Sequence, residues 1–230
     1  MNNKMFSQKG FSLIEVLIVL LIFTVIALAI LRAYVSVVHV AGNSSAGAKS
    51  DSSVMFGLAT ADRILQGAGY GANSSVTSSY GTTLAAYNSS GTQVSVGTAG
   101  SSLVWKSDTS TCQALIISNK DNPLNTSSSA TTHTGSGLFY YGAGYSCSSL
   151  ALPTSSTTTE TPTILVPVSD TNLTMASLKV TTTTNCNPYN VTNSLTNGGA
   201  YAVVLTANVY AGSGTTQNTV NNQTCLFNFR

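Results

Sequence analysis

The sequence predicts an α+β fold in which one long N-terminal helix packs on a C-terminal antiparallel β-sheet. Three observations lead to this prediction. Residues 11–31 form an almost uninterrupted apolar run, and residues 32–70 contain no proline and continue a helical pattern. After residue 70 the pattern changes to short apolar runs separated by Ser, Thr, Asn and Gly, which is typical of strands and turns. We therefore expect an extracytoplasmic β-rich globular domain over residues 71–230.

The composition excludes two classes of protein. Of 230 residues, only 7% are charged, which is far below the usual share in globular proteins. The hydrophobic share is 43%, which is too high for a disordered chain. Ser and Thr together number 65, which suits polar, uncharged loops. The net charge is +2 with no basic cluster, so nothing indicates the phosphate contacts that nucleic-acid binding requires.

Residues 11–31 are long enough to cross a membrane. These 21 residues carry one charge, Glu15. As a helix they would extend about 31 Å, the thickness of a bilayer core. Lys4 and Lys9 precede the run and favour an N-terminus on the cytoplasmic side, so that the rest of the chain lies outside.

Two ordinary interpretations of this run leave Glu15 unexplained. A secretory signal would be cleaved after the small residues of Ala27-Leu28-Ala29, and a plain anchor would need only the apolar span. An acid at the centre of a bilayer costs up to about 3 kcal/mol and is a functional candidate by default. A buried carboxylate is tolerable when it is paired with a cation, so Glu15 needs a partner.

The residues around Glu15 resemble a known signal. The segment Lys9-Gly10-Phe11-Ser12-Leu13-Ile14-Glu15-Val16-Leu17 resembles the class III signal of type IV pilins and type II secretion pseudopilins. The resemblance implies that residues 1–10 are a leader, that prepilin peptidase cleaves between Gly10 and Phe11, and that Phe11 becomes the N-methylated end. It also implies that Glu15 pairs with the Phe11 amine of a neighbouring subunit in a helical filament.

The same resemblance sets the expected role. It implies a structural subunit of a type IV pilus, assembled with other pilin subunits by an inner-membrane platform, and neither an enzyme nor a protein with a cofactor. The subunit would be an inner-membrane single-pass protein before it enters an extracellular filament or a periplasmic pseudopilus. A type II secretion pseudopilin and a tip adhesin that uses the same assembly route remain alternatives.

Details beyond the signal favour a minor subunit. Thr24 and Arg32 stand where many major pilins have helix-breaking Gly and Pro, so the spanning helix should stay regular. Residues 62–70, which end in Ala-Gly-Tyr, are similar to a segment of PilW-like minor pilins and J-type pseudopilins.

The helix is expected to continue to about residue 70 as an amphipathic element. Its apolar positions follow one helical face: Val54, Leu58, Ala61, Leu65 and Ala68. The glycines within residues 42–47 predict a kink or a looser stretch, and those at 67 and 69 predict the end of the helix.

Seven runs are expected to be strands of one antiparallel sheet on this helix. They are residues 102–106, 112–118, 137–141, 163–168, 173–180, 200–210 and 224–229. Residues 71–100 are expected to be a connecting loop with one strand at most. Residues 125–134 and 154–162 are expected to be loops.

The cysteines indicate two disulfide bonds. Cys112, Cys147, Cys186 and Cys225 lie on the exported side, where an even number of cysteines favours disulfides, and three pairings are possible. We favour Cys112–Cys147 and Cys186–Cys225, because each closes a short loop between neighbouring segments. A zinc site would need closely spaced cysteines or nearby histidines, which this sequence lacks.

No pattern indicates catalysis. His39 and His133 have no acid or cysteine close in sequence, and Asp108, Asp121, Glu160 and Asp170 are isolated in polar segments and expected to be solvated. The aromatic residues Phe139, Tyr140, Tyr141 and Tyr145 are expected to be half buried in the sheet, although an exposed adhesive patch is the alternative. Neither a nucleophile motif nor a phosphate-binding loop is present.

Overall fold

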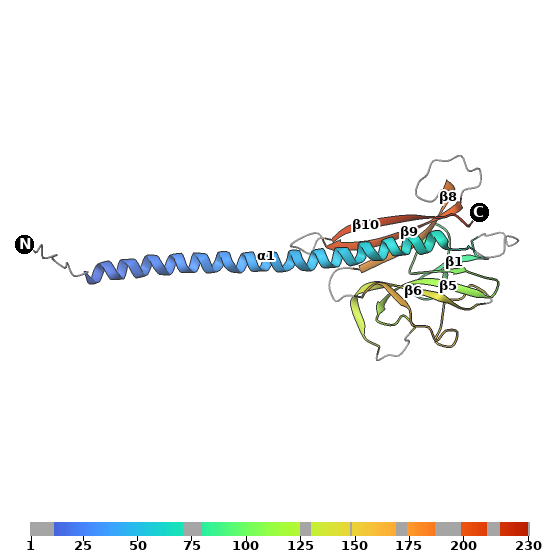
Figure 1. Ribbon diagram of the computed structural model, residues 1–230, viewed down its shortest axis with the longest axis horizontal. Coiled ribbons are helices and arrows are strands. Elements are labelled where there is room, and N and C mark those ends of the chain that lie inside the picture. Colours follow the sequence, from blue (N-terminus) through green and yellow to red (C-terminus); the bar gives the residue numbers. More distant parts are fainter. Residues whose placement is uncertain are drawn as a thin grey trace, which may run out of the picture. The chain divides into compact units, whose positions relative to one another are not determined.

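The computed structural model describes residues 12–70, 80–124, 130–147, 149–168, 174–186, 199–210 and 217–229. It has the predicted α+β class, with one long helix followed by antiparallel strands (Figure 1). The chain divides into two compact units, residues 1–46 and residues 47–230, and each is described by itself. Gly10 and Phe11 lie outside the described residues.

Helix α1 spans Leu13–Gly67 and is 55 residues long. It begins after Ser12, whose carbonyl oxygen accepts the backbone N–H groups of Glu15 and Val16 at 3.0 and 3.3 Å. Residues 42–47 belong to the helix, so their glycines do not end it. Thr24 fits the helix because its hydroxyl donates to the carbonyl oxygen of Leu21 at 2.8 Å.

The strands form two antiparallel sheets, where the sequence predicts one. The six-stranded sheet has the order β2-β1-β4-β5-β6-β7 and the four-stranded sheet has the order β10-β9-β8-β3. The bounds in the first sheet are Gln93–Val94, Leu84–Tyr87, Ser102–Lys106, Thr111–Lys120, Thr132–Ser146 and Thr163–Val166. In the second sheet they are Gln217–Leu226, Gly199–Tyr210, Thr174–Cys186 and Ala99–Gly100.

All seven predicted runs contain strand, but the sequence-based prediction was wrong in three other places. Residues 80–100 contain β1, β2 and β3 where one strand at most was expected. Residues 132–134 were expected to be loop and instead begin β6. The last strand ends at Leu226 and starts at Gln217, earlier than predicted, because its polar residues 217–223 continue the pairing with β9.

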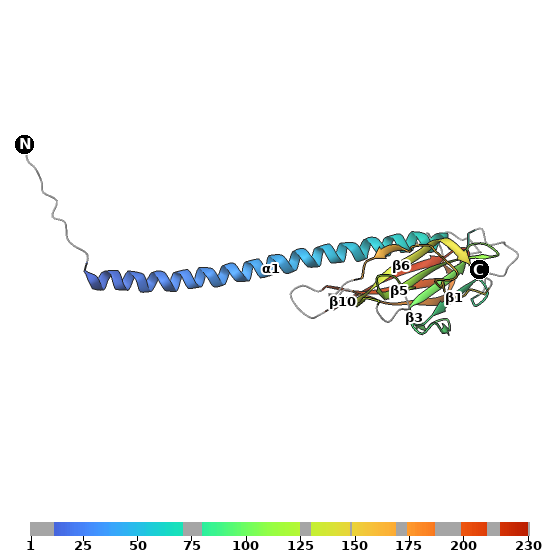
Figure 2. The same ribbon diagram turned by 90° about the horizontal axis from the view of Figure 1, so that it is seen from below.

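The predicted helical stripe is the centre of the main core. Val54, Leu58, Ala61, Leu65 and Ala68 are all buried. They pack in one cluster with residues of both sheets, including Trp105 and Leu115 of the first and Leu178, Val203 and Leu205 of the second. Figures 1 and 2 show the last turns of α1 running along both β9–β10 and the sheet that contains β5 and β6.

The six-stranded sheet is buried on both faces. Its second face carries a separate cluster that includes Tyr87, Val104, Tyr141 and Leu150. The Tyr87 hydroxyl donates to the carbonyl oxygen of Leu150, and the segment after β6 thereby covers this face. The first four residues of β4, Ser102 to Trp105, are therefore all buried, and such a pattern cannot reveal which side faces the helix.

Polar contacts fix β10 and the C-terminus to α1. The side-chain amide of Asn222 donates to the Leu58 carbonyl oxygen at 3.1 Å, and the Thr224 hydroxyl donates to Asp62 at 2.6 Å. The Asn228 amide donates to the Ala68 carbonyl oxygen at 2.9 Å, which satisfies a backbone acceptor at the helix end.

Gly57 is a tight contact between α1 and the edge strand β7. A Cβ atom at Gly57 would lie 2.3 Å from Val166 Cγ2 and 2.5 Å from the Leu165 carbonyl oxygen, whereas one at Gly67 would meet nothing within 4 Å. We expect Gly57→Ala to lower the free energy of unfolding by about 2 kcal/mol through overpacking. Gly67→Ala, the matched control, should leave it unchanged or raise it by about 0.5 kcal/mol. Chemical denaturation of the full chain measures both, and equal stability of the two variants would contradict this packing.

Alkaline pH should destabilise the protein. Burial raises the pKa of Tyr80, Tyr87, Tyr140, Tyr141 and Tyr145 above the ordinary value of 10.0. Above pH 10 the unfolded chain therefore loses tyrosine protons that the folded chain retains, and stability falls as the pH rises. Melting temperatures recorded from pH 8 to pH 11 should decrease above about pH 10.

The Tyr141 hydroxyl provides a control for this pH effect. It is buried and has no hydrogen-bond partner among the described residues. We expect Tyr141→Phe to keep or slightly raise stability at pH 7, because it removes an unsatisfied buried group, and to reduce the loss above pH 10. A large loss of stability at pH 7 in this variant would show that the hydroxyl is bonded.

Candidate functional site

The first part of α1 carries an apolar surface that the chain itself does not cover. Residues Leu13–Gly42 are long and apolar enough to cross a membrane, and no part of this stretch is buried. Phe23 is 65% exposed and Val37 is 66% exposed. The core helix of a soluble protein would pass the same test of length and composition, but it would be buried. This surface therefore requires lipid or other apolar helices as its surroundings.

Glu15 lies at the beginning of this helix. It is the acid of the first turn, and its backbone N–H donates to the Ser12 carbonyl oxygen at 3.0 Å. A negative charge here interacts favourably with the positive end of the helix dipole. Arg32, the first cation of the described helix, lies about 25 Å farther along it, too far to pair with Glu15.

Ser12 is a residue that the sequence analysis missed. The spacing Ser12-Leu13-Ile14-Glu15 is that of a capping box, in which a serine precedes the first helical residue and a glutamate follows three positions later. The S-x-x-E pattern before an apolar run was readable in the sequence. This spacing suits a capping role for Glu15 at the start of the helix, and any test of Glu15 has to separate such a role from its charge.

Both disulfide bonds have the pairing that the sequence analysis favours. Cys112 of β5 bonds to Cys147, which follows β6, with 5.7 Å between the Cα atoms. Cys186 at the end of β8 bonds to Cys225 of β10, with 5.6 Å between the Cα atoms, and β9 lies between these strands. The cysteines are therefore joined in pairs and do not hold zinc. The first bond joins the ends of two adjacent strands, and the second joins the two strands on either side of β9.

The ionisable candidates lie in separate local contacts. His133 is in β6 rather than in a loop, and its Nε2 atom is 3.1 Å from Asp121, an acid twelve positions away in the sequence. The pairing of β5 with β6 brings these two residues together. Asp108 accepts the Thr109 N–H at 2.6 Å, and Asp170 lies outside the described residues.

Glu160 is not simply solvated, as the sequence analysis expected. Its Oε1 atom accepts the Ala143 backbone N–H at 2.9 Å, and its Oε2 atom is buried. Across the part of the chain that the structure describes, no three His, Cys, Asp or Glu side chains are grouped so that they could hold a metal ion.

The aromatic residues of β6 belong to the sheet. Phe139, Tyr141 and Tyr145 are buried, and the Tyr140 ring stacks on Trp105 with 6.1 Å between ring centroids. They were expected to be half buried in the sheet; they lie in the sheet, but only Tyr140 is half-buried and the other three are fully buried. The adhesive patch that was its alternative is not present at these four positions.

Comparison with known proteins identifies the N-terminal segment. Residues 5–31 match the family model described as the prokaryotic N-terminal methylation motif. This prepilin-type signal supports the class of type IV pilins and pseudopilins, and together with the uncovered helix it fits anchoring in a membrane before assembly. No curated protein and no solved structure gives a significant match to the chain.

Proposed function

We propose that this protein is a minor subunit, most similar to PilW-like minor pilins, of a type IV pilus. Prepilin peptidase removes residues 1–10 and methylates Phe11. The inner-membrane platform then transfers the subunit from the bilayer into the filament. Its role is structural: α1 anchors and assembles the subunit, and the β-rich unit is displayed on the outer side.

The observation that carries this proposal is the methylation motif at the start of a helix with an uncovered apolar surface. Apolar surface contributes about 25 cal/mol per Å² when it leaves water, so the helix is stable either in lipid or among other helices. Transfer of the helix from lipid to a bundle of helices costs little free energy, because both surroundings are apolar. The same helix therefore serves as the anchor before assembly and as the packing element after it.

Glu15 makes this otherwise unspecific packing of apolar helices specific for one register. A carboxylate inside an apolar bundle is tolerated when a cation neutralises it, and the new amine of Phe11 on a neighbouring subunit supplies that cation. Correct register of the two helices brings the charges together, and wrong register leaves a buried charge unpaired. Glu15 thus selects one arrangement of neighbouring subunits.

The N-terminus of the protein on the cell surface tests the proposal directly. Mass spectrometry of material sheared from the cells should find a peptide that starts at N-methylated Phe11. A type II secretion pseudopilin would have the same N-terminus but would stay out of the sheared fraction. A start at Ile30 would mean a secreted protein, and an intact Met1 found only in membranes would mean a simple anchor. Either of the last two results contradicts the proposal.

Two substitutions at Glu15 separate its charge from its capping role. Glu15→Val removes both, whereas Glu15→Gln removes the charge and keeps a side chain suited to a capping box. We expect both variants to be processed at Gly10 but to enter filaments about tenfold less than the wild type, because an unpaired buried amine costs more than 1 kcal/mol. Quantitative blotting of sheared filaments against whole cells measures this. Normal incorporation of Glu15→Gln would show that the cap, and not the charge, matters.

A further inference from the structure

The chain changes from one sheet to the other at Gly100–Ser102. Ala99 and Gly100 pair with Lys179 and Leu178 of β8, and Ser102 already pairs with Ile116 of β5. The crossing is tight, because a Cβ atom at Gly100 would lie 2.7 Å from the Tyr87 carbonyl oxygen. One continuous segment therefore covers part of β8 and then part of β5.

After the crossing, no described strand pairs with the β4 side of β5 near its end. The Ile117 N–H donates to the Ser101 carbonyl oxygen at 2.7 Å, so Ile117 directs its backbone groups toward the β4 side. Successive residues of a strand direct their backbone N–H and C=O groups to opposite sides. Asn119, two residues after Ile117, therefore directs these groups to the β4 side as well. In this register its partner would be Ala99, but Ala99 pairs with β8.

The edge of β8 is uncovered in the same way. The Val180 carbonyl oxygen accepts the Gly97 N–H at 2.7 Å, so Val180 directs its backbone groups toward β3. Along β8 the register would place Ser102 opposite Ala176, but Ser102 pairs with β5. Ala176 lies at a bulge in the pairing with β9 and is exposed.

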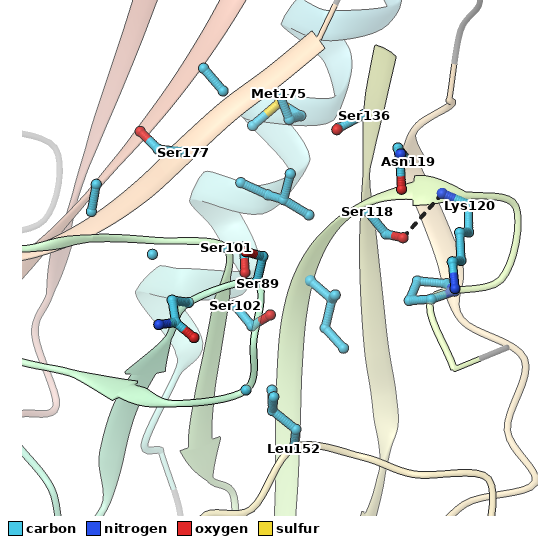
Figure 3. Close-up of a pocket in the computed structure, with 18 of the residues that line it drawn as sticks. Ser89, Ser101, Ser102, Ser118, Asn119, Lys120, Ser136, Leu152, Met175 and Ser177 are labelled. Atoms are coloured by element: carbon cyan, nitrogen blue, oxygen red, sulfur yellow. Dashed lines mark hydrogen bonds between the residues drawn. The ribbon is translucent and has the colours of Figure 1, made fainter. Parts of the chain in front are cut away.

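These two edges line one groove, of about 710 Å³. Figure 3 shows Ser118, Asn119 and Lys120 on one wall, Met175 and Ser177 on the other, and Ser101 and Ser102 at the crossing. Most of the lining side chains are small and uncharged, and such side chains leave backbone groups accessible. Lys120 is the one charged residue among the described residues that line it.

We propose that this groove binds an extended peptide segment of a partner protein by strand addition to β5. The peptide backbone pairs with the N–H and C=O of Asn119, in the place that a straight β4 would have occupied, and the β8 edge at Ala176 forms the opposite wall. An acidic side chain of the peptide lies near Lys120. This binding is separate from assembly through α1 and does not depend on it.

The chemistry of the groove favours a peptide over other ligands. Uncovered backbone donors and acceptors of two strands are a template for another strand, and natural proteins usually protect such edges. The single lysine is too little charge for a nucleic acid. A neutral glycan would use the hydroxyl groups but would not require the strand geometry at Asn119, and this difference can be tested.

Selection from a peptide library tests the inference. Full-length protein in detergent micelles is exposed to random hexapeptides displayed on phage, and enriched peptides are synthesised for fluorescence-anisotropy titration. We expect the enriched peptides to contain an acidic residue. Methylation of alternate backbone nitrogens of the peptide should weaken its binding at least about tenfold, because it removes hydrogen-bond donors. Hydrogen exchange at Asn119 should slow when the peptide is bound.

Variants locate the binding. Asn119→Pro removes a backbone donor that has no strand partner among the described residues, and it should weaken binding about tenfold. Thr159→Pro, on an exposed segment outside the groove, should not weaken it. Lys120→Gln should weaken binding about threefold, and Lys106→Gln, also outside the groove, should have no effect.

Three results would overturn the inference. The first is that the library yields no enriched peptide. The second is that the backbone-methylated peptide binds as tightly as the unmethylated one. The third is that an Asn119→Pro variant with an unchanged melting temperature binds the peptide as tightly as the wild type. If Asn119→Pro does not fold, titration of the wild-type protein with the methylated peptide still tests the inference. Glycan binding on an array without any peptide enrichment would assign the groove to carbohydrate and equally overturn it.

Discussion

The β-rich unit depends on the burial of one helical stripe. Val54, Leu58, Ala61, Leu65 and Ala68 meet side chains of both sheets in a single cluster. The second face of the six-stranded sheet is covered by the segment after β6, whereas its first face and the four-stranded sheet share this cluster with α1. Large buried side chains such as Trp105 and Leu205 contribute about 2 kcal/mol each from burial. The helix is therefore the common partner that makes two sheets one unit.

Sequence periodicity predicted the parts that depend on one local pattern. The stripe of α1 repeats at helical spacing and is buried as expected, and the apolar runs at 102–106 and 200–210 are strands. The division into two sheets was not predictable, because β4 is buried on both faces and lacks an alternating pattern. The strands of residues 84–100 were missed because their residues are mostly small or polar and gain their order from pairing.

The candidate sites show the same limit. The signal around Glu15 is a continuous motif, and its capping pattern with Ser12 could have been read from spacing alone. The contact between His133 and Asp121 depends on the register of β5 with β6, and the groove depends on a change of sheet at Gly100. Long-range register is set by many pairings at once, so no single segment of the sequence contains it.

The attachment of the C-terminus to α1 has a consequence for the order of folding. The helical stripe is synthesised early, but the residues that complete its cover and bond the carbonyl groups near its end, Asn222, Thr224 and Asn228, follow only after β9. Phe229 closes over Gly69 only then. Until these residues are synthesised the nascent chain therefore presents an incompletely covered apolar helix, and a chain that stops before β10 lacks Leu226 and Phe229 of this core.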